Sequence, residues 1–190
     1  MTTEVSLYGM TTPSAATGCN TAEQLIAHAA RVSNPGNQSN LLTAPKLIRY
    51  LIKNKHWSPF EMVSITMDIV TTRDIARQIL RHRSFSFQEF SQRYADVTQL
   101  ENAFCIRDLR MQDTKNRQNS IVIDDEELSQ WWEVKQKELL VYVQDLYGEA
   151  LGMGVAKEVA RVILPEGLTM SRLYVNGTIR SWLHYLEVRL

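Results

Sequence analysis

One short stretch of the chain carries the side chains best suited to bind an anionic ligand. Arg81, His82 and Arg83 follow one another directly, and Arg93 comes soon after them. Adjacent cations repel one another unless an anion neutralises them, and a guanidinium group can form paired hydrogen bonds with phosphate or carboxylate oxygens. The stretch therefore predicts an anion site and favours a phosphorylated ligand. For Arg81–Arg83 alone, a solvated basic helix end that offsets the helix dipole is the alternative.

Large apolar rings alternate with hydrogen-bonding groups in the rest of this stretch. Three phenylalanines stand among polar residues: Ser84, Phe85, Ser86, Phe87, Gln88, Glu89, Phe90 and Ser91. A plain surface loop has little use for three such rings. A pocket that packs a flat ring and reads its polar edges does use them. The alternation therefore indicates a ligand pocket.

The spacing of these residues resembles the signature of the flavin-dependent thymidylate synthases. In that signature Arg-His-Arg is followed by seven residues and then Ser, which are here Arg81, His82, Arg83 and Ser91. The match is specific, because uncommon residue types recur at a fixed spacing. Further residues fit the family's extended pattern: Gln78, Glu89, Arg93 and Tyr94.

Two other segments resemble motifs of the same family. Residues 56–61 follow its pattern His-x-Ser/Thr-x-Phe-Glu, although Met62 stands where the family often has a second His. Residues 160–165 resemble a segment whose arginine, here Arg161, binds the substrate phosphate. Without the resemblance, residues 56–61 are equally a proline turn with packed aromatic rings, and Arg161 a helix arginine whose stem covers apolar surface.

The end of the chain carries the last resemblance. His184 matches a flavin-contacting position, and Arg189 matches an arginine that activates the substrate. The family usually has Asn two residues before Arg180, where this chain has Thr178. The family also continues beyond this helix, so we expect a single domain, residues 1–190, that is short at its C-terminus.

The resemblance implies the reductive methylation of dUMP to dTMP. Methylenetetrahydrofolate would donate the carbon, FAD would carry hydride, NADPH would be the reductant, and a homotetramer would share its sites between protomers. Arg189 would be catalytic, stabilising negative charge as the uracil loses its imide proton. The implied dUMP contacts are Gln78, Arg81, Glu89, Ser91, Gln92, Arg93, Arg161 and Arg189. The implied FAD contacts are His56, Ser58, Arg81, His82, Arg83, Glu89, Thr178, Arg180 and His184.

Composition limits the competing functions. Lys plus Arg and Asp plus Glu both number 21, so the formal net charge is zero, whereas non-specific nucleic-acid binding needs a basic field. The alternative is nonetheless a nucleic-acid-binding module in which Arg81, Arg83, Arg93 and the phenylalanines form a stacking platform. That module would be colourless and would bind oligonucleotides in a salt-sensitive way. A flavoprotein of the same fold without methylation activity is the third possibility.

The cysteines and the hydropathy pattern predict a soluble, cytoplasmic protein without a membrane segment. Cys19 and Cys105 form no CxxC pair, no secretory leader is visible, and no apolar run approaches the roughly 20 residues of a membrane helix. Neither cysteine has a Pro-Cys-His-like setting, Ser91 lies in no nucleophile elbow, and the four histidines have no metal-ligand spacing. We therefore expect no covalent nucleophile and no metal site.

The predicted fold is α/β of the α+β type, with a small, mainly antiparallel sheet flanked by helices. It is not a Rossmann fold, because no glycine-rich dinucleotide fingerprint is present. We expect strands at 5–10, 63–69, 103–107 and 168–175, and helices at 21–33, 44–55, 73–80, 124–151, 155–164 and 178–189. Thr21, Thr43 and Thr72 are the expected helix caps. Residues 108–119 are charged and polar without a period, and we expect them to form a mobile excursion. The third helix would place Gln78 and Arg81 on one face.

Overall fold

The computed structural model describes residues 3–189, which form two compact units. The first unit comprises Val70–Arg77 and Glu89–Arg172, with the start of the chain up to Glu4. The second unit comprises Val5–Ile69, Gln78–Gln88 and the residues from Leu173 onward.

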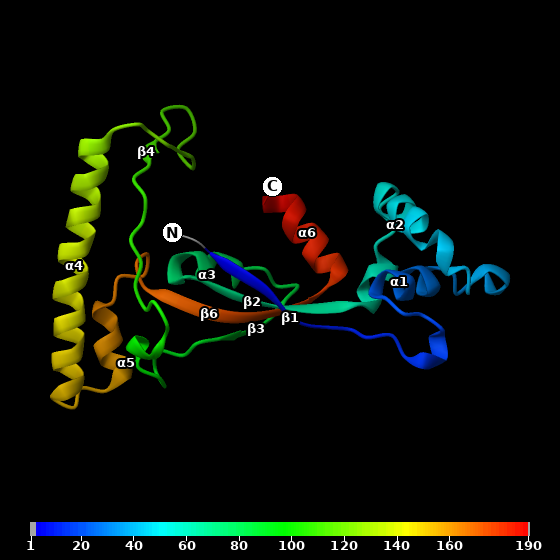
Figure 1. The fold of residues 1–190 in the computed structure, drawn as a ribbon, viewed down its shortest axis with the longest axis horizontal. Helices are drawn as coiled ribbons and strands as arrows, with labels where there is room; N and C mark the ends of the chain where they lie inside the picture. Colours follow the sequence, from blue (N-terminus) through cyan, green and yellow to red (C-terminus); the bar gives the residue numbers. More distant parts are fainter. Residues whose placement is uncertain (1–2, 190) are drawn as a thin grey trace. The chain divides into compact units, whose positions relative to one another are not determined.

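Helices, a four-stranded sheet and a two-stranded hairpin make up the described chain (Figure 1). The strands are β1 (Glu4–Met10), β2 (Ser64–Thr72), β3 (Ser86–Glu89), β4 (Met111–Gln112), β5 (Ser120–Ile121) and β6 (Met170–Thr178). The helices are α1 (Ala22–Ala30), α2 (Ala44–Lys53), α3 (Arg73–Ile79), α4 (Glu126–Gly152), α5 (Lys157–Ala160) and α6 (Ile179–Arg189). The main sheet has the order β1-β2-β6-β3, with β1 at an edge, and β4 pairs with β5 in a separate antiparallel hairpin. The mixed α/β class predicted from the sequence is confirmed.

The long helix α4 organises the first unit. Asp125 caps its start by accepting a hydrogen bond from the Leu128 amide at 2.9 Å, and Gly154 follows its end with a left-handed φ of 84°. Its buried side chains recur every three or four residues, so they line one face: Gln136, Leu140, Val143 and Tyr147. Tyr147 packs there against Val97 and Ala160 in the unit's core.

The second unit has its own core under α1 and α2. The buried members of this core are Ile26, Leu51, Phe60 and Val63. Leu183 of α6 and Trp57 pack against them and are partly buried. Thr21 caps α1 as predicted, since its hydroxyl accepts a hydrogen bond from the Gln24 amide at 3.3 Å. The core therefore fixes residues 57–63, the segment that leads into β2.

Several predicted elements differ from those observed. Thr43 precedes α2, but its hydroxyl accepts a hydrogen bond from Arg31 at 2.7 Å and makes no cap bond. The strand expected at 103–107 is wrong: in the described structure this segment contributes one bridge, between Phe104 and Thr169. The helix expected at 155–164 is split into α5 and a 3-10 helix, Arg161–Ile163, which ends before Pro165.

Residues 108–119, predicted as a mobile excursion, contain β4 and the turn that joins it to β5. The Asp113 carboxylate accepts hydrogen bonds from the Lys115 and Asn116 amides and from the Asn119 side chain, at 2.8, 3.2 and 2.8 Å. These bonds, that from Lys115 first, lower the pKa of Asp113. The hairpin could not be predicted from hydrophobic periodicity, because polar side chains and not an apolar face hold it together.

The helix α3 ends earlier than predicted. Its last residue is Ile79, so Arg81 lies in the following turn and does not share a helix face with Gln78. The turn closes through a hydrogen bond from the His82 amide to the Ile79 carbonyl at 3.1 Å. The Arg-His-Arg sequence is thus displayed on a turn and not on a helix.

No helix within residues 3–189 combines the length and apolar character needed to cross a membrane.

Candidate functional site

The first unit contains an arginine pocket of about 300 Å³. Arg73 and Arg77 come from successive turns of α3, and Arg161 begins the 3-10 helix after α5. Three guanidinium groups and one lining carboxylate leave the pocket positively charged. The complete lining is Arg73, Arg77, Gln92, Arg161, Val162, Leu164 and Glu166. Guanidinium groups at this density suit a phosphate or carboxylate ligand.

Gln92 supplies an unpartnered donor to this pocket. The residue is only 3% exposed, and its Nε2 atom makes no hydrogen bond within the described part of the chain. A buried donor without a partner costs about 1–3 kcal/mol, so such groups are rare unless a ligand or water satisfies them. Because Gln92 also lines the arginine pocket, a ligand oxygen there could accept this bond.

Glu89 holds the α3 arginines in place. Its Oε1 atom accepts a hydrogen bond from Ser171 at 2.9 Å and lies 3.6 Å from Nη1 of Arg73, while its Oε2 lies 3.5 Å from Nη1 of Arg77. Nε of Arg77 also lies 3.3 Å from Oε1 of Glu166. Glu89 was predicted to contact both ligands, and the structure shows that its carboxylate is already engaged by two arginines and a serine.

The electrostatic balance of the pocket favours one more negative charge. Burial lowers the pKa of the Arg73 guanidinium, and the charge of Arg77 lowers it further, whereas Glu89 and Glu166 raise it. Arg161 adds to the repulsion. A bound anion would relieve this crowding of cations.

Ser91 and Arg93 lie close to Gln92 in sequence but outside the pocket lining. Ser91 is exposed, and its carbonyl accepts hydrogen bonds from the Tyr94 and Ala95 amides at 3.0 and 2.9 Å. Nη2 of Arg93 lies 3.4 Å from Oε2 of Glu158, and both side chains are more than half exposed. Among the implied dUMP contacts in the first unit, Gln92 and Arg161 line the arginine pocket, whereas Ser91 and Arg93 lie outside its lining.

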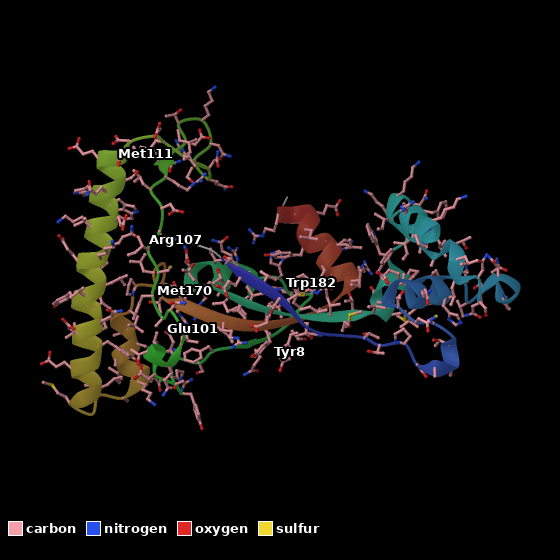
Figure 2. The ribbon with its side chains drawn as sticks, viewed as in Figure 1. Tyr8, Glu101, Arg107, Met111, Met170 and Trp182 are labelled. Carbon is pink, nitrogen blue, oxygen red and sulfur yellow. The ribbon has the colours of Figure 1, made fainter. Side chains whose placement is uncertain are left out.

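A second, larger hollow of about 430 Å³ in the first unit has no predicted site residue in its lining. Glu101 and Met170, labelled in Figure 2, both line it. The Cys105 thiol lines it as well, and burial raises the pKa of that thiol, which is the opposite of what a nucleophile needs.

In the second unit, the Arg-His-Arg turn is anchored by an aromatic cluster. Phe85 is 8% exposed, and its ring centroid lies 4.5 Å from that of Trp182 and 5.8 Å from that of Tyr185 on α6. A Cβ atom at Gly177 would lie 2.3 Å from Cδ1 of Phe85, so only glycine allows this contact. Trp182, labelled in Figure 2, also donates from Nε1 to the Ile65 carbonyl at 3.3 Å. Phe85 is thus a structural anchor and not the wall of an open pocket.

A shallow polar hollow of about 410 Å³ lies beside this cluster in the second unit. Its lining is Glu61, Ser84, Thr178, Arg180, Ser181 and His184. Arg180 forms an ion pair with Glu61, and the His184 ring lies edge-on to Trp57 with centroids 4.9 Å apart. Three of the implied FAD contacts, Thr178, Arg180 and His184, therefore converge on one hollow.

Thr178 and Asn176 have local partners that explain their positions. The Thr178 hydroxyl accepts a hydrogen bond from the Ser181 amide at 3.2 Å, as a cap at the start of α6 does. Nδ2 of Asn176 donates to the Thr66 hydroxyl at 2.8 Å, across from β6 to β2. Asn176 thus links the neighbouring strands β6 and β2.

Arg81 and Arg83 are exposed on the turn, and within residues 3–189 neither has a carboxylate at ion-pair distance. His82 lies between them, and its Nε2 atom is 3.2 Å from Nη2 of Arg189 at the end of α6. The remaining implied contacts of this unit, His56, Ser58 and Gln78, are also exposed and lie outside the polar hollow.

Arg73, Arg77 and Glu166 were not predicted from the sequence. A signal for the two arginines is present, because Arg73, Arg77 and Arg81 recur at intervals of four residues, which on a helix places arginines on one side. Of these three, only Arg81 was predicted as a site residue. Glu166 gave no signal, because its role depends on the fold that brings it to α3.

An arginine pocket with an unpartnered amide, together with a polar hollow, is typical of an enzyme that binds phosphorylated ligands. The family model described as thymidylate synthase complementing protein matches residues 16–190 of this chain. A probable flavin-dependent thymidylate synthase of Paramecium bursaria Chlorella virus 1 is 52% identical over 172 residues, which cover 90% of this chain and 78% of that protein. The flavin-dependent thymidylate synthase of a Synechocystis strain is 51% identical over 167 residues, which cover 88% of this chain and 74% of that protein.

A solved structure is similar over nearly the whole chain. The UMP/dUMP methylase PolB from Streptomyces cacaoi, bound with 5-Br UMP, superposes with a TM-score of 0.78 at 28% identity. The match covers 97% of this chain and 75% of that one. The chain belongs to the flavin-dependent thymidylate synthase family, and the predicted family and fold are confirmed.

Proposed function

We propose that this chain catalyses the reductive methylation of dUMP to dTMP, using FAD as hydride carrier, methylenetetrahydrofolate as carbon donor and NADPH as reductant. Relatives 52% and 51% identical to the chain are named as flavin-dependent thymidylate synthases, one of them as probable. These names confirm the enzyme class and the flavin predicted from the sequence. The similar PolB structures, bound with 5-Br UMP and 5-Br dUMP, support a uridine nucleotide as the substrate.

The observation that carries the nucleotide assignment is the buried, unpartnered amide of Gln92 in the arginine pocket. A phosphate oxygen would accept the Nε2 hydrogen bond that the described chain leaves unmade. Arg161 would bind the same phosphate, because its Nε already donates to the Glu158 carbonyl at 3.2 Å and so fixes the side chain at the pocket. We therefore propose that this pocket holds the nucleotide phosphate.

Glu89 would act on the nucleotide indirectly as well as by contact. Its ion pairs with Arg73 and Arg77 keep both guanidinium groups at the pocket and limit their mutual repulsion. Removing the Glu89 charge would therefore leave Arg73 buried beside two cations without its nearest carboxylate. Arg93 would bind the phosphate only after its ion pair with Glu158 breaks. The assignment of Ser91 and Arg93 as phosphate contacts stays a prediction.

The second unit has the donors that a flavin requires. Arg81 and Arg83 are exposed cations without carboxylate partners in the described chain, and the polar hollow offers Ser84, Arg180 and His184. A flavin dinucleotide carries a pyrophosphate and several ring acceptors, so this set of donors fits it chemically. FAD, when bound, would carry hydride from NADPH to the nucleotide. His56, Ser58, Thr178 and His82 complete the proposed contacts.

Arg189 would stabilise the negative charge that develops on the uracil. A guanidinium group keeps its charge at every physiological pH and is a hydrogen-bond donor only, so it favours the deprotonated imide. Gln78 and Arg81 are the proposed orienting contacts.

Three parts of the proposal rest on the family resemblance alone. They are a homotetramer with shared sites, the binding of folate, and the binding of NADPH. The cytoplasmic location rests on the cysteines, which are both free thiols in the structure, Cys19 buried and Cys105 partly buried.

The alternative function, a nucleic-acid-binding module, is disfavoured by one observation. Base stacking needs exposed rings, whereas Phe85 is buried against Trp182 and Tyr185. Phe87 and Phe90 are partly buried as well.

The experiment is product formation. Protein loaded with FAD is incubated with dUMP, methylenetetrahydrofolate and NADPH, and nucleotides are separated by chromatography. We expect dTMP that depends on all four components. Absence of dTMP from FAD-saturated, folded protein would overturn the proposal. A matched Gln92→Leu variant tests the phosphate assignment separately, because it should raise the KM for dUMP and leave flavin content unchanged.

A further inference from the structure

Arg189 has one polar side-chain contact in the described chain, and that contact is a histidine. Nη2 of Arg189 lies 3.2 Å from Nε2 of His82. A guanidinium group can only donate, so His82 must accept with Nε2 unprotonated. The contact therefore requires the neutral imidazole that carries its proton on Nδ1.

The imidazole is held in place by its neighbours on both sides. Its centroid lies 4.8 Å from the ring of Tyr185, at an interplanar angle of 73°, and 6.4 Å from the ring of Phe85. Phe85 itself is fixed by Gly177 and Trp182. The acceptor of the Arg189 hydrogen bond is thus positioned by a packed cluster before any ligand arrives.

The charges around His82 favour its neutral form. Arg81 lies on the same turn, while Arg189 and the phenol of Tyr185 face it from α6. Partial burial lowers the pKa of His82 first, and the charges of Arg189 and then Arg81 lower it further. Above that pKa the ring can accept, and below it the ring becomes a third cation in the cluster.

We propose that His82 is a positioning residue, whose neutral imidazole holds the Arg189 guanidinium in the orientation used at the uracil. The proposal rests on the proposed function, because it takes the catalytic role of Arg189 from it. Protonation of His82 would remove the acceptor, repel Arg189 and release it. Acid loss of turnover would then follow the titration of His82.

The first test is independent of activity. The Cε1–H signals of the four histidines are followed by NMR as a function of pH in the full chain, with and without FAD, and the His82 signal is identified as the one missing in His82→Gln. In Arg189→Met the pKa of His82 should rise toward its usual range, because a hydrogen-bond donor and a positive charge are removed. Arg49→Met is the matched control, since Arg49 is an exposed arginine of α2 in the same unit, and it should leave the titration unchanged.

The second test is a pH profile at saturating FAD and dUMP. Glutamine can accept from Arg189 and does not titrate, so His82→Gln should abolish the fall of kcat at low pH. Phenylalanine cannot accept, so His82→Phe should lower kcat about tenfold at the pH values where the parent imidazole is neutral, with dUMP binding retained.

Three results would overturn the proposal: an unshifted His82 titration in Arg189→Met, an equal shift in Arg49→Met, or an acid limb that persists in His82→Gln. If the parent protein forms dTMP, an unshifted His82 titration in Arg189→Met would refute the positioning role alone. If the parent protein forms no dTMP, a shifted titration in Arg189→Met would refute the proposed function and leave the His82–Arg189 contact standing.

Discussion

Replacing Gly177 with alanine should disrupt the anchor of the Arg-His-Arg turn. The added Cβ atom would lie 2.3 Å from Cδ1 and 2.5 Å from Cε1 of Phe85, far inside van der Waals contact. The ring cannot turn away freely, because Trp182 and Tyr185 lie against it with centroids 4.5 and 5.8 Å away. Phe85 or the backbone of β6 must therefore shift.

The expected cost follows from overpacking in a filled core. Forcing an extra methyl group into such a site typically destabilises a protein by about 1–3 kcal/mol. For a chain of this size each kcal/mol lowers the melting temperature by roughly 2–4 °C, so we expect a decrease of roughly 2–12 °C. Because Phe85 follows the Arg-His-Arg turn, flavin affinity should decrease together with stability.

The assay is thermal unfolding followed by circular dichroism, with FAD titration by visible absorbance. Gly148→Ala is the matched control, because nothing lies within 4 Å of a Cβ there and the site is inside α4. Alanine should raise stability at that position by up to about 1 kcal/mol. Phe85→Ala removes the clashing ring, so adding Gly177→Ala to it should cost little more. A Gly177→Ala protein as stable as the parent, or additive effects in the double variant, would refute the role given to this contact.

The arginine pocket yields three further predictions. Gln92→Leu should raise the free energy of unfolding by about 1–3 kcal/mol, since it removes a buried unpaired amide. The same variant should raise the KM for dUMP. A destabilised variant with an unchanged KM would argue against phosphate binding in this pocket. Arg161→Gln should raise the KM for dUMP roughly 10- to 100-fold, which corresponds to the free energy of a hydrogen bond between charged groups. An unchanged KM with a lower kcat would show that the phosphate binds elsewhere. Arg73→Lys should retain more dUMP affinity than Arg73→Met in calorimetric titrations, because lysine keeps the positive charge beside Glu89. Equal losses of dUMP affinity in the two variants would show that this charge does not contribute to binding.

The sequence predicted the fold and the site to different degrees. Elements with strong local signals were correct: Thr21 caps α1, and the helix expected at 124–151 is observed as α4. The strand expected at 5–10 is observed as β1. These features depend on neighbours in sequence, so the sequence contains them.

The elements that were missed depend on contacts between distant residues. The segment 103–107 has a strand-like composition, but within the described chain it forms one bridge, between Phe104 and Thr169. The β4–β5 hairpin is held by the Asp113 carboxylate, which no hydrophobic period reveals. Composition and periodicity cannot report such pairings.

The site followed the same rule. Gln92 and Arg161 were predicted through the family resemblance and do line one pocket, although they lie far apart in sequence. Arg73 was not predicted as a site residue, because its ion pair with Glu89 and its burial exist only in the folded chain. Phe85 was expected in a ligand pocket but anchors a turn, because Gly177 and α6 cover it.

If the proposed function is correct, dUMP and a flavin act together on this protein. We would load it with FAD, add NADPH anaerobically, and record the visible absorption spectrum with and without dUMP. We expect a flavin spectrum that NADPH bleaches at a rate changed by dUMP, with dTMP formed once methylenetetrahydrofolate is added. A folded protein that binds no FAD, or a flavin that stays oxidised with NADPH and dUMP present, would contradict it.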